Sequence, residues 1–443
     1  MTYKLPIFVA IAACLSICVA YHGPDLPRGP FCGLNGRCCT RREDDCSHQI
    51  LDSLCYCDEF CNRTSTRGHD DCCPDYEEVC MGIYTTPPPP PPEPEVQACR
   101  LGTQGYAPGD TVLQGCNTCI CRYPELPESN HWDCERDPCI ISDEVLRRVN
   151  QDRRLTWRAS NYTEFQNKKL RDGIVYKLGT LPLSSLTLNL GAIYYDKHIP
   201  YPKHFDARRQ WPRFISAVRD QGWCGSDWAV SIASIASDRL AIQSNGAEVV
   251  QLSPQTLLSC NTNRHQQACL GGEVTTGWVF VKKYGLMDED CFPYNTNVPR
   301  CPPRFRRGNL ISDGCKPSVP LRTSRYKVGP PSKLVKEHDI MYDIMESGPV
   351  QAVMTVYQDF FHYRDGIYRR SNYGNYEYKG LHSVRIIGWG EENGQKYWIV
   401  ANSWGTQWGE DGYFRIVRGE NECEIETFVV SAVSYVTEAY RRK

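Results

Sequence analysis

The sequence predicts one large α+β domain in its C-terminal half, preceded by small disulfide-rich modules. The 443 residues include 25 cysteines, and the densest groups of cysteines lie before residue 140. Small and apolar residues recur at helical spacing after Asp227, and the chain ends in a series of strand-like segments. Because domains usually contain about 100 to 200 residues, the chain has room for the large domain and several modules.

The charge balance and the N-terminus indicate where this protein acts. Lys and Arg total 50 against 52 Asp and Glu, so no overall field favours nucleic acid or a membrane surface as a partner. Lys4, the apolar run from Ile7 to Val19 and a small residue at Ala20 predict a signal peptide over residues 1–20. No later run is long enough to span a membrane. We therefore expect a secreted protein of the extracellular space or matrix.

The remaining 23 cysteines fall into groups of ten, six and seven. In an oxidising compartment such groups form disulfides that stabilise modules with little hydrophobic core. The sequons at Asn62 and Asn161 are consistent with secretion, and they predict a glycoprotein.

The first module, residues 32–80, holds ten cysteines and few aliphatic residues. Its pattern includes Cys55-x-Cys57-Asp-Glu and the vicinal pair Cys72-Cys73 followed by Pro-Asp-Tyr. This pattern resembles a somatomedin B domain with a lengthened loop before Cys72. A zinc site is the alternative, but vicinal pairs and an extracellular setting favour disulfides, so we predict no metal.

A proline-rich linker over residues 85–97 follows, and it should adopt a stiff polyproline II conformation. Residues 99–139 then contain Cys116-x2-Cys119-x-Cys121 and Trp132-x-Cys134-x4-Cys139. This spacing resembles a shortened von Willebrand factor type C module. Neither module is large enough to bury a catalytic pocket, so both are expected to bind partners or to act as spacers.

Residues 141–198 contain few cysteines, a charged stretch from Asp143 to Leu155 that favours a helix, and Trp157-Arg-Ala-x-Asn161. They resemble the short propeptide of cathepsin B, which implies a segment that lies across an active-site cleft. We call residues 141–198 the propeptide-like segment. Whether it is cleaved stays open.

The large domain, residues 199–443, carries the motifs that point to chemistry. Val218-Arg-Asp-Gln221-Gly-Trp-Cys224-Gly-Ser-Asp227-Trp228 precedes the predicted helix, and His382 begins an alternating, strand-like run. Ala401-Asn402-Ser403-Trp404-Gly405 follows. These motifs resemble the papain family, cathepsin B most of all, which implies a two-lobed fold with a helical lobe and a β-barrel-like lobe. With its N-terminal modules, the chain resembles the tubulointerstitial nephritis antigen family, whose members are secreted and catalytically inactive.

The papain resemblance assigns a role to four positions. Gln221 matches the oxyanion donor, His382 the base and Asn402 the residue that orients the base, whereas the nucleophile position holds Asp227. Papain-type catalysis needs a thiolate at a helix N-terminus, and a carboxylate is a weak nucleophile toward an amide. We therefore predict a pseudo-peptidase. Our hypothesis is that Asp227 and His382 form a carboxylate–imidazolium pair. These two ligands are too few for a metal site, and we predict no cofactor.

The neighbouring residues receive structural interpretations. The hydroxyl of Ser226 is expected to cap the helix. The family pattern implies a disulfide between Cys224 and Cys269. Cys260, Cys291, Cys301 and Cys315 allow three pairings, which leaves Cys423 as the expected free thiol.

Two further features concern the cleft. Gly271 and Gly272 would let a peptide backbone approach closely, and Trp404 and Trp408 would form a wall, although tight-turn glycines and core tryptophans explain them equally well. The stretch from Cys291 to Cys315 lacks the paired histidines of the cathepsin B occluding loop. Its arginines are a candidate site for sulfated glycans, and a solvated surface loop is the alternative.

These features predict a non-catalytic binding, adhesion or ligand-adaptor protein. The family resemblance implies partners such as laminin and collagen of the matrix, cell-surface receptors or secreted ligands. The first alternative is an active papain-type peptidase with residual activity, because Gln221, His382 and Asn402 are retained. The second is a decoy that sequesters protease inhibitors or substrates in the old cleft.

Overall fold

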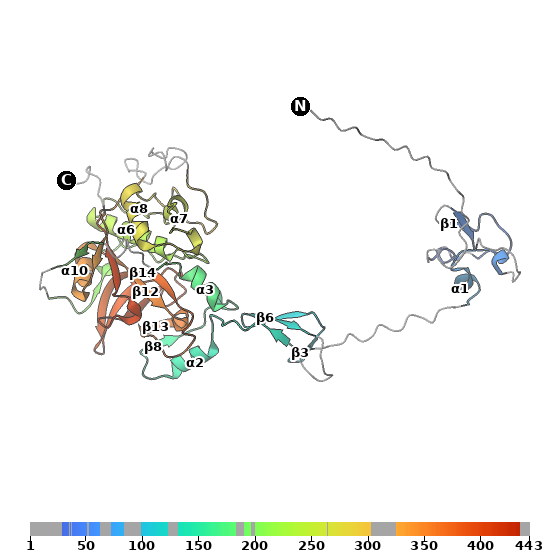
Figure 1. Cartoon of the computed structure of the whole chain (residues 1–443), viewed down its shortest axis with the longest axis horizontal. Coiled ribbons are helices and arrows are strands. Elements are labelled where there is room, and N and C mark those ends of the chain that lie inside the picture. Colours follow the sequence, from blue (N-terminus) through green and yellow to red (C-terminus); the bar gives the residue numbers. More distant parts are fainter. Residues whose placement is uncertain are drawn as a thin grey trace, which may run out of the picture. The chain divides into compact units, whose positions relative to one another are not determined.

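The computed structural model describes residues 29–34, 36, 38–50, 53–62, 72–83, 99–122, 132–182, 190–195, 200–263, 265–302 and 325–434. The predicted signal peptide, the proline-rich linker and the arginines of the 303–324 stretch lie outside these ranges. The chain divides into two compact units, Met1–Val96 and Gln97–Lys443 (Figure 1).

The first unit is held together by disulfides. Strands β1 (Ser47–Ile50) and β2 (Ser53–Tyr56) form an antiparallel pair, followed by η1 (Glu59–Asn62) and helix α1 (Tyr76–Cys80). Its buried core consists largely of cysteines, as expected for so small a module. The predicted framework is confirmed, since all ten cysteines pair: Cys32–Cys57, Cys38–Cys80, Cys39–Cys46, Cys55–Cys73 and Cys61–Cys72.

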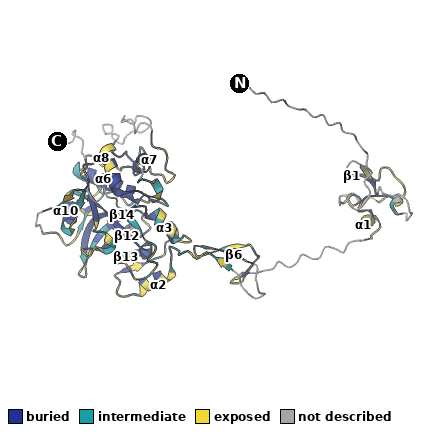
Figure 2. Ribbon diagram, in the orientation of Figure 1, coloured by how far each residue is buried: buried dark blue, intermediate teal, exposed yellow. Residues whose placement is uncertain are grey.

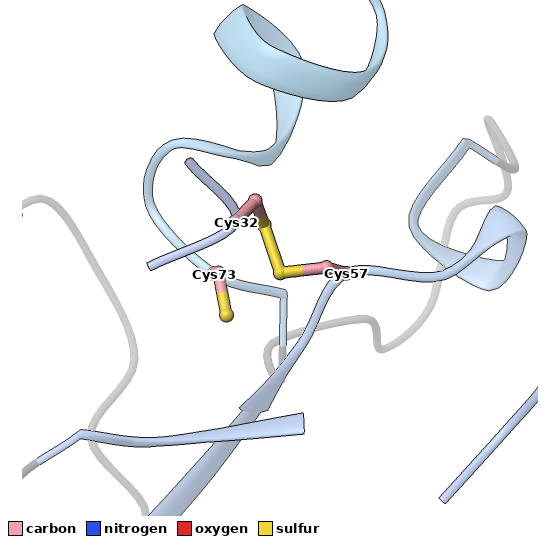
Figure 3. A group of neighbouring side chains, drawn as sticks. All are labelled: Cys32, Cys57 and Cys73. Atoms are coloured by element: carbon pink, nitrogen blue, oxygen red, sulfur yellow. A yellow bond between two sulfur atoms is a disulfide. The ribbon is translucent and has the colours of Figure 1, made fainter. Parts of the chain in front are cut away.

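Three sulfurs of this unit lie close enough together to suggest a metal site. They belong to Cys32, Cys57 and Cys73, whose Sγ atoms all lie within 4.8 Å of one another. Figure 3 shows the bond that joins Cys32 to Cys57, and Cys73 is bonded to Cys55. Because disulfide sulfurs are not thiolates, this cluster offers no zinc ligands.

The second unit begins with a small module of short strands. Strands β3 (Cys99–Leu101) and β4 (Gln104–Tyr106) form a hairpin, and β5 (Thr111–Gln114), β6 (Asn117–Cys121) and β7 (Trp132–Cys134) form a three-stranded sheet. Its six cysteines pair as Cys99–Cys121, Cys116–Cys139 and Cys119–Cys134.

The propeptide-like segment is built into the domain that follows it. It comprises α2 (Asp143–Gln151), β8 (Trp157–Ala159), η2 (Thr163–Phe165), α3 (Leu170–Lys177) and the short strand β9 (Ala192–Ile193). Helix α2 ends four residues before the predicted Leu155, with Asp152 as its C-cap. Strands β8 and β9 lie at opposite ends of the main sheet. The side chains of Trp157, Phe165 and Leu170 belong to the core of the domain.

The sheet lobe consists of a ten-stranded sheet with helix α10 (Glu337–Ser347) and the shorter α5 (Ala207–Gln210). The strands run in the order β8-β13-β16-β15-β14-β12-β17-β11-β9, and β10 pairs with β14. The strands not yet placed are β10 (Phe205–Asp206), β11 (Ser332–Leu334), β12 (Val350–Val356), β13 (Tyr363–Tyr368), β14 (Gly380–Glu392), β15 (Gln395–Ala401), β16 (Tyr413–Val417) and β17 (Phe428–Ser431). Two 3-10 turns, η4 (Gln358–His362) and η5 (Glu422–Glu424), complete the lobe.

The helical lobe contains α6 (Asp227–Gln243), α7 (Gln255–Cys260), η3 (Ala268–Leu270) and α8 (Val274–Tyr284). Figure 1 shows α6, α7 and α8 gathered beside the strands of the sheet lobe. The helix predicted after the Asp227 motif is confirmed as α6. It is buried from Asp227 to Ala241; most of these residues are apolar or small, and the buried Asp238 and Arg239 are paired with Arg385 and Asp343.

Helix α6 and strand β14 bring the two lobes together. Figure 2 shows both as buried elements. The run from His382 to Gly390 alternates in sequence, yet every one of its residues is buried, because β14 pairs with β12 and β15 and packs against α6. Among the residues described, no helix is long and apolar enough to cross a membrane. The fold is thus the predicted α+β domain preceded by disulfide-rich modules.

Candidate functional site

Asp227 is the first residue of α6, and its carboxylate is completely buried. Its Oδ2 accepts three hydrogen bonds: from the hydroxyl of Thr180 (2.6 Å), from the backbone N–H of Ser383 (2.8 Å) and from Nδ1 of His382 (3.0 Å). The positive end of the helix macrodipole also favours an anion at this position. The arrangement holds the carboxylate firmly and directs it at the imidazole.

Both ring nitrogens of His382 lie within hydrogen-bond distance of side chains of the site. Its Nε2 lies 2.7 Å from Oδ1 of Asn402, and that oxygen also accepts a bond from the backbone N–H of Ser403 at 2.8 Å. Because a backbone N–H can only donate, the Asn402 atom must be the amide oxygen. Nε2 of His382 therefore donates to Asn402, and Nδ1 faces the carboxylate of Asp227, which is the contact that the hypothesis of a carboxylate–imidazolium pair requires. The ring is thus engaged on both sides by neighbouring side chains.

Gln221, the expected oxyanion donor, is also completely buried. Its Oε1 accepts a bond from the hydroxyl of Ser403 (2.6 Å), which fixes the amide. Its Nε2 donates to the backbone carbonyls of Cys224 (2.8 Å), Lys177 (3.3 Å) and Tyr176 (3.4 Å). Two of these three carbonyls come from the propeptide-like segment, so the donor is occupied by the chain itself.

The propeptide-like segment crosses the groove between the lobes as an extended strand. Thr180 forms β-bridges with Gly272 on one side and with Leu381 on the other. The N–H of Gly272 donates to the carbonyl of Gly179 (2.9 Å), and the N–H of Leu181 donates to the carbonyl of Gly272 (3.0 Å). The close approach of a peptide backbone expected at Gly272 is therefore made by this chain's own residues.

Glycines on both surfaces make this crossing geometrically feasible. A Cβ added at Gly179 would lie 1.9 Å from the carbonyl oxygen of Gly225. A Cβ added at Gly225 would lie 2.7 Å from the carbonyl oxygens of Val175 and Cys269. Gly272 is required for another reason, because its Cβ would meet the ring of Trp228 at 2.3 Å. The segment and the start of α6 thus fit only because neither has a side chain where the two backbones meet.

Both tryptophans proposed for the cleft wall are buried, and Trp404 lies beneath the propeptide-like segment. Trp404 and Trp408 are each 1% exposed, and their rings lie 5.0 Å apart. Phe165 packs edge-on against Trp404 at 5.8 Å, and the indole N–H of Trp404 donates to the carbonyl of Lys177 (3.3 Å). For Trp404 the wall and core interpretations therefore describe the same surface, which the covering segment buries. Trp408 packs among Phe360, Tyr363 and Phe414 of the sheet lobe, as the core interpretation has it.

A buried lysine anchors the covering segment. The side chain of Lys177 is completely buried, and its ammonium group is paired with Glu164. The ammonium group also lies 5.3 Å from the ring of Trp223 and 5.7 Å from that of Phe165. A buried charge with a carboxylate and two aromatic faces is well compensated. Glu164 and Phe165 belong to η2 of the same segment, so of these three contacts the one with Trp223 joins the segment to the large domain.

One residue behaves differently from its prediction. Ser226 is the N-cap of α6, but its hydroxyl makes no capping bond. The hydroxyl instead lies 2.6 Å from the hydroxyl of Tyr294, which donates to the carbonyl of Gln221 at 2.7 Å. The capping prediction was wrong because a tertiary partner takes the hydroxyl. Burial, the largest cause, raises the pKa of Tyr294 to about 12, so the phenol remains a donor.

The cysteines around the site are structural. Cys224 and Cys269 are joined by a disulfide, the pairing that the family resemblance implies. Cys260 pairs with Cys301, which selects one of the three alternatives, and Cys291 is also disulfide-bonded. Cys423 is a free thiol whose pKa is raised well above its ordinary value, mainly by burial. Such a thiol stays protonated and is a poor nucleophile.

Sequence reasoning missed three partners of the site: Thr180, Ser383 and Tyr294. Thr180 lies 47 positions before Asp227, and no spacing rule connects the two. Ser383 acts through its backbone, which leaves no signature in the side chain. The predicted glycosylation site Asn161 lies at an exposed position, whereas the side chain of Asn62 is outside the described part of the structure.

Comparison with known proteins shows which proteins this chain is similar to. Residues 201–433 match the model of the papain family cysteine proteases. Tubulointerstitial nephritis antigen-like from Mus musculus is 40% identical over 426 residues, which cover 91% of this chain and 88% of that protein. Tubulointerstitial nephritis antigen from Homo sapiens is 37% identical over 437 residues, covering 93% and 88% respectively.

Solved structures agree with this relationship. Procathepsin B S9 from Trypanosoma congolense superposes with a TM-score of 0.58 at 29% identity, covering 67% of this chain and 99% of that chain. The digestive procathepsin L2 proteinase of Tenebrio molitor gives a TM-score of 0.54 at 25% identity, covering 66% and 89%. With similarity along nearly the whole length of the curated relatives, the chain belongs to the tubulointerstitial nephritis antigen family and carries a papain-family domain at its C-terminal end.

Proposed function

We propose that this protein is a secreted glycoprotein of the extracellular matrix whose papain-like domain is non-catalytic and serves adhesion or ligand binding. The observation that carries the proposal is the state of Asp227. Its Oδ2 accepts three hydrogen bonds at a completely buried position, one of them from the ring of His382. A carboxylate so stabilised attacks an amide poorly, and His382 has no free nitrogen with which to act as a base.

The occupied groove supports the same conclusion. A peptide substrate would need the backbone of Gly272 and the amide of Gln221, and both are bonded to the propeptide-like segment. The segment also contributes Trp157 and Phe165 to the core. Exposing the groove would therefore require loss of buried apolar area as well as of hydrogen bonds.

The proposed location rests on the disulfides. Ten disulfides join described cysteines, and so dense a framework persists in an oxidising compartment. The exposed sequon at Asn161 is accessible to glycosylation.

A peptidase assay tests the non-catalytic assignment. Wild-type protein should not hydrolyse fluorogenic peptides. Asp227→Cys, in a chain cut at a specific protease site inserted between residues 183 and 189, is the comparison: hydrolysis by this variant would show that the segment can leave the groove although both new ends are anchored. Hydrolysis by wild-type protein that disappears in Asp227→Ala would establish the alternative, an active peptidase with residual activity.

The binding role is supported by apolar side chains on the surface of the first unit. Val79, Met81 and Ile83 are 40%, 36% and 47% exposed within one short segment at the end of α1. Exposed apolar groups that cluster in this way favour contact with another protein. The partners we propose are matrix proteins of the laminin and collagen class, cell-surface receptors or secreted ligands.

Binding of the full chain to immobilised laminin and collagen tests this role. Ile83→Asp should weaken capture, while Val279→Asp, at a residue 50% exposed on α8, is the matched control. Equal losses in both variants, or none in either, would argue against the first unit as the adhesive surface. Tight binding of a cystatin-type inhibitor would instead favour the decoy alternative, which requires the inhibitor to displace residues 179–181.

A further inference from the structure

A cavity of 520 Å³ opens in the sheet lobe, where β10 and α5 meet β14 and β15. Its lining includes His204, Phe205, Arg208, Arg209 and Tyr397, and we call it the basic pocket. The volume lies within the range of about 300 to 1,000 Å³ that is usual for ligand pockets. No part of the function proposed above uses it.

The rim of the basic pocket is cationic. His204, Arg208 and Arg209 are all exposed. The acidic residue among the lining side chains, Asp206, is bonded to Arg208 through Nε (3.0 Å) and Nη2 (2.7 Å), so its charge is already compensated. Arg209 forms no ion pair with any residue of the described ranges. Lys203, next to His204 in the chain, is exposed as well.

Arg208 is held in place before any ligand arrives. Its guanidinium lies over the ring of Tyr413, 4.3 Å from the ring centroid, in addition to its pair with Asp206. The side chain nevertheless remains 42% exposed. Because Asp206 already accepts from Nε and Nη2, this fixed guanidinium offers its Nη1 side to an anion, and Arg208→Gln would also leave the Asp206 carboxylate uncompensated at the rim.

The walls of the pocket are aromatic. Phe205 stacks on the buried Trp389 with ring centroids 4.8 Å apart and an interplanar angle of 18°. Tyr397 is half-buried on the neighbouring strand β15. Aromatic side walls below a cationic rim suit a ligand that has both flat apolar faces and anionic groups.

The pocket is separate from the groove. His382 and Trp389 both belong to β14 but stand seven residues apart, which corresponds to roughly 20 Å along a strand. Occupation of the basic pocket therefore requires no displacement of residues 179–181.

We propose that the basic pocket binds a sulfated glycosaminoglycan. Arginine forks bind sulfate and carboxylate groups in a bidentate manner, and sugar rings present apolar faces to aromatic side chains. An acidic peptide would satisfy the cations but would have no flat ring for the aromatic walls. The proposal deepens the proposed function, since it presupposes a protein in the matrix and names a class of matrix ligand.

Binding of a heparin octasaccharide to the full chain at physiological salt tests the proposal. Wild-type protein should bind it, and removal of the sulfate groups from the same octasaccharide should abolish binding. Arg209→Gln should weaken binding about tenfold, the loss expected for one charge-assisted interaction, and Arg208→Gln/Arg209→Gln should weaken it about a hundredfold. Tyr397→Leu should weaken binding without changing its dependence on salt, because it removes ring stacking and no charge.

Two control variants keep the test specific. Arg147→Gln removes an exposed arginine of α2 and should leave the affinity unchanged. Replacement of Arg304, Arg306 and Arg307 by glutamine tests the rival arginine-rich stretch. Loss of binding in that triple variant with full binding in Arg209→Gln would overturn the proposal, as would failure of wild-type protein to bind or equal affinity for a polyglutamate peptide. Thermal unfolding of each variant checks its fold.

The outcomes separate this proposal from the proposed function. If wild-type protein neither cleaves peptides nor binds the octasaccharide, the pocket proposal fails and the non-catalytic assignment stands. If it cleaves peptides and also binds the octasaccharide through Arg209, the non-catalytic assignment fails and the pocket proposal stands.

Discussion

Replacing Thr180 by valine should loosen the propeptide-like segment where it crosses the groove. Valine keeps the shape of the side chain and removes the hydroxyl that donates to the buried Asp227 carboxylate at 2.6 Å. A hydrogen bond to a charged group contributes about 1.5 to 3 kcal/mol. The carboxylate keeps its bonds from His382 and Ser383, so the lost free energy should weaken the attachment of residues 179–181 to the groove.

Hydrogen exchange measures the free energy needed to open the segment at the groove. The amides of Leu181 and Gly272 form the two backbone bonds of the crossing, so their exchange reports local opening. A loss of 1.5 to 3 kcal/mol corresponds to exchange roughly 10- to 150-fold faster. Amides in the β14–β15 pairing should keep their rates, because that part of the sheet is untouched.

A matched control removes the same chemistry elsewhere. Tyr368→Phe also deletes a hydroxyl that donates to a buried carboxylate, that of Asp359 at 3.0 Å, but it lies on β13, which β16 and β15 separate from β14. It should leave exchange at Leu181 and Gly272 unchanged. Unchanged exchange in Thr180→Val, or equal acceleration in both variants, would refute the view that Asp227 now anchors the covering segment.

Three further predictions follow from buried charges. Nitrogen NMR of His382 should show two protonated ring nitrogens near neutral pH, and Asp227→Asn should produce a singly protonated ring; a singly protonated ring in wild-type protein would contradict the assigned pair. Burial raises the pKa of Asp359 to about 6, so folding stability should fall as pH rises from about 4 to about 6, where the unfolded carboxyl has ionised and the folded one has not. Chemical denaturation across this range should show the free energy of unfolding falling by about 3 kcal/mol in wild-type protein and not in Asp359→Asn. Parallel profiles of the two proteins would exclude a raised pKa of Asp359. Arg239→Met should lower the free energy of unfolding by about 3 to 5 kcal/mol in the same assay, because it leaves the buried carboxylate of Asp343 without its cation. An unchanged free energy of unfolding would show that the ion pair is dispensable.

The sequence predicted those parts of the fold that depend on local pattern. The buried helix α6 followed from small and apolar residues at helical spacing, and the crowding of cysteines before residue 140 indicated disulfide-bonded modules. The positions of Gln221, His382 and Asn402 followed from resemblance. The structure brings His382 to Asp227, Asn402 to His382, and Gln221 to the hydroxyl of Ser403.

What the sequence could not predict depends on contacts between distant residues. The hydroxyl of Ser226 has a local partner in its own helix and a tertiary partner in Tyr294, 68 positions away, and only the folded chain shows that the latter wins. The same holds for Cys260, whose three candidate partners are chemically identical and differ only in where the fold puts them. Nothing in the sequence around Thr180 distinguishes it from other polar residues, because its role depends on its contact with the carboxylate of Asp227.

The strand β9 has a consequence for any proteolytic processing of this protein. After stretch 183–189, Ala192 and Ile193 pair with β11, and the hydroxyl of Tyr195 donates to Asp343. Before this stretch, residues 179–181 are bonded across the groove. A single cut within that stretch would leave both new ends anchored. Each disulfide between described cysteines lies wholly before or wholly after the stretch. A nicked molecule would thus migrate as two bands on a denaturing gel without reductant, yet elute as one particle in gel filtration, so fragment size alone would not reveal whether the groove had been uncovered.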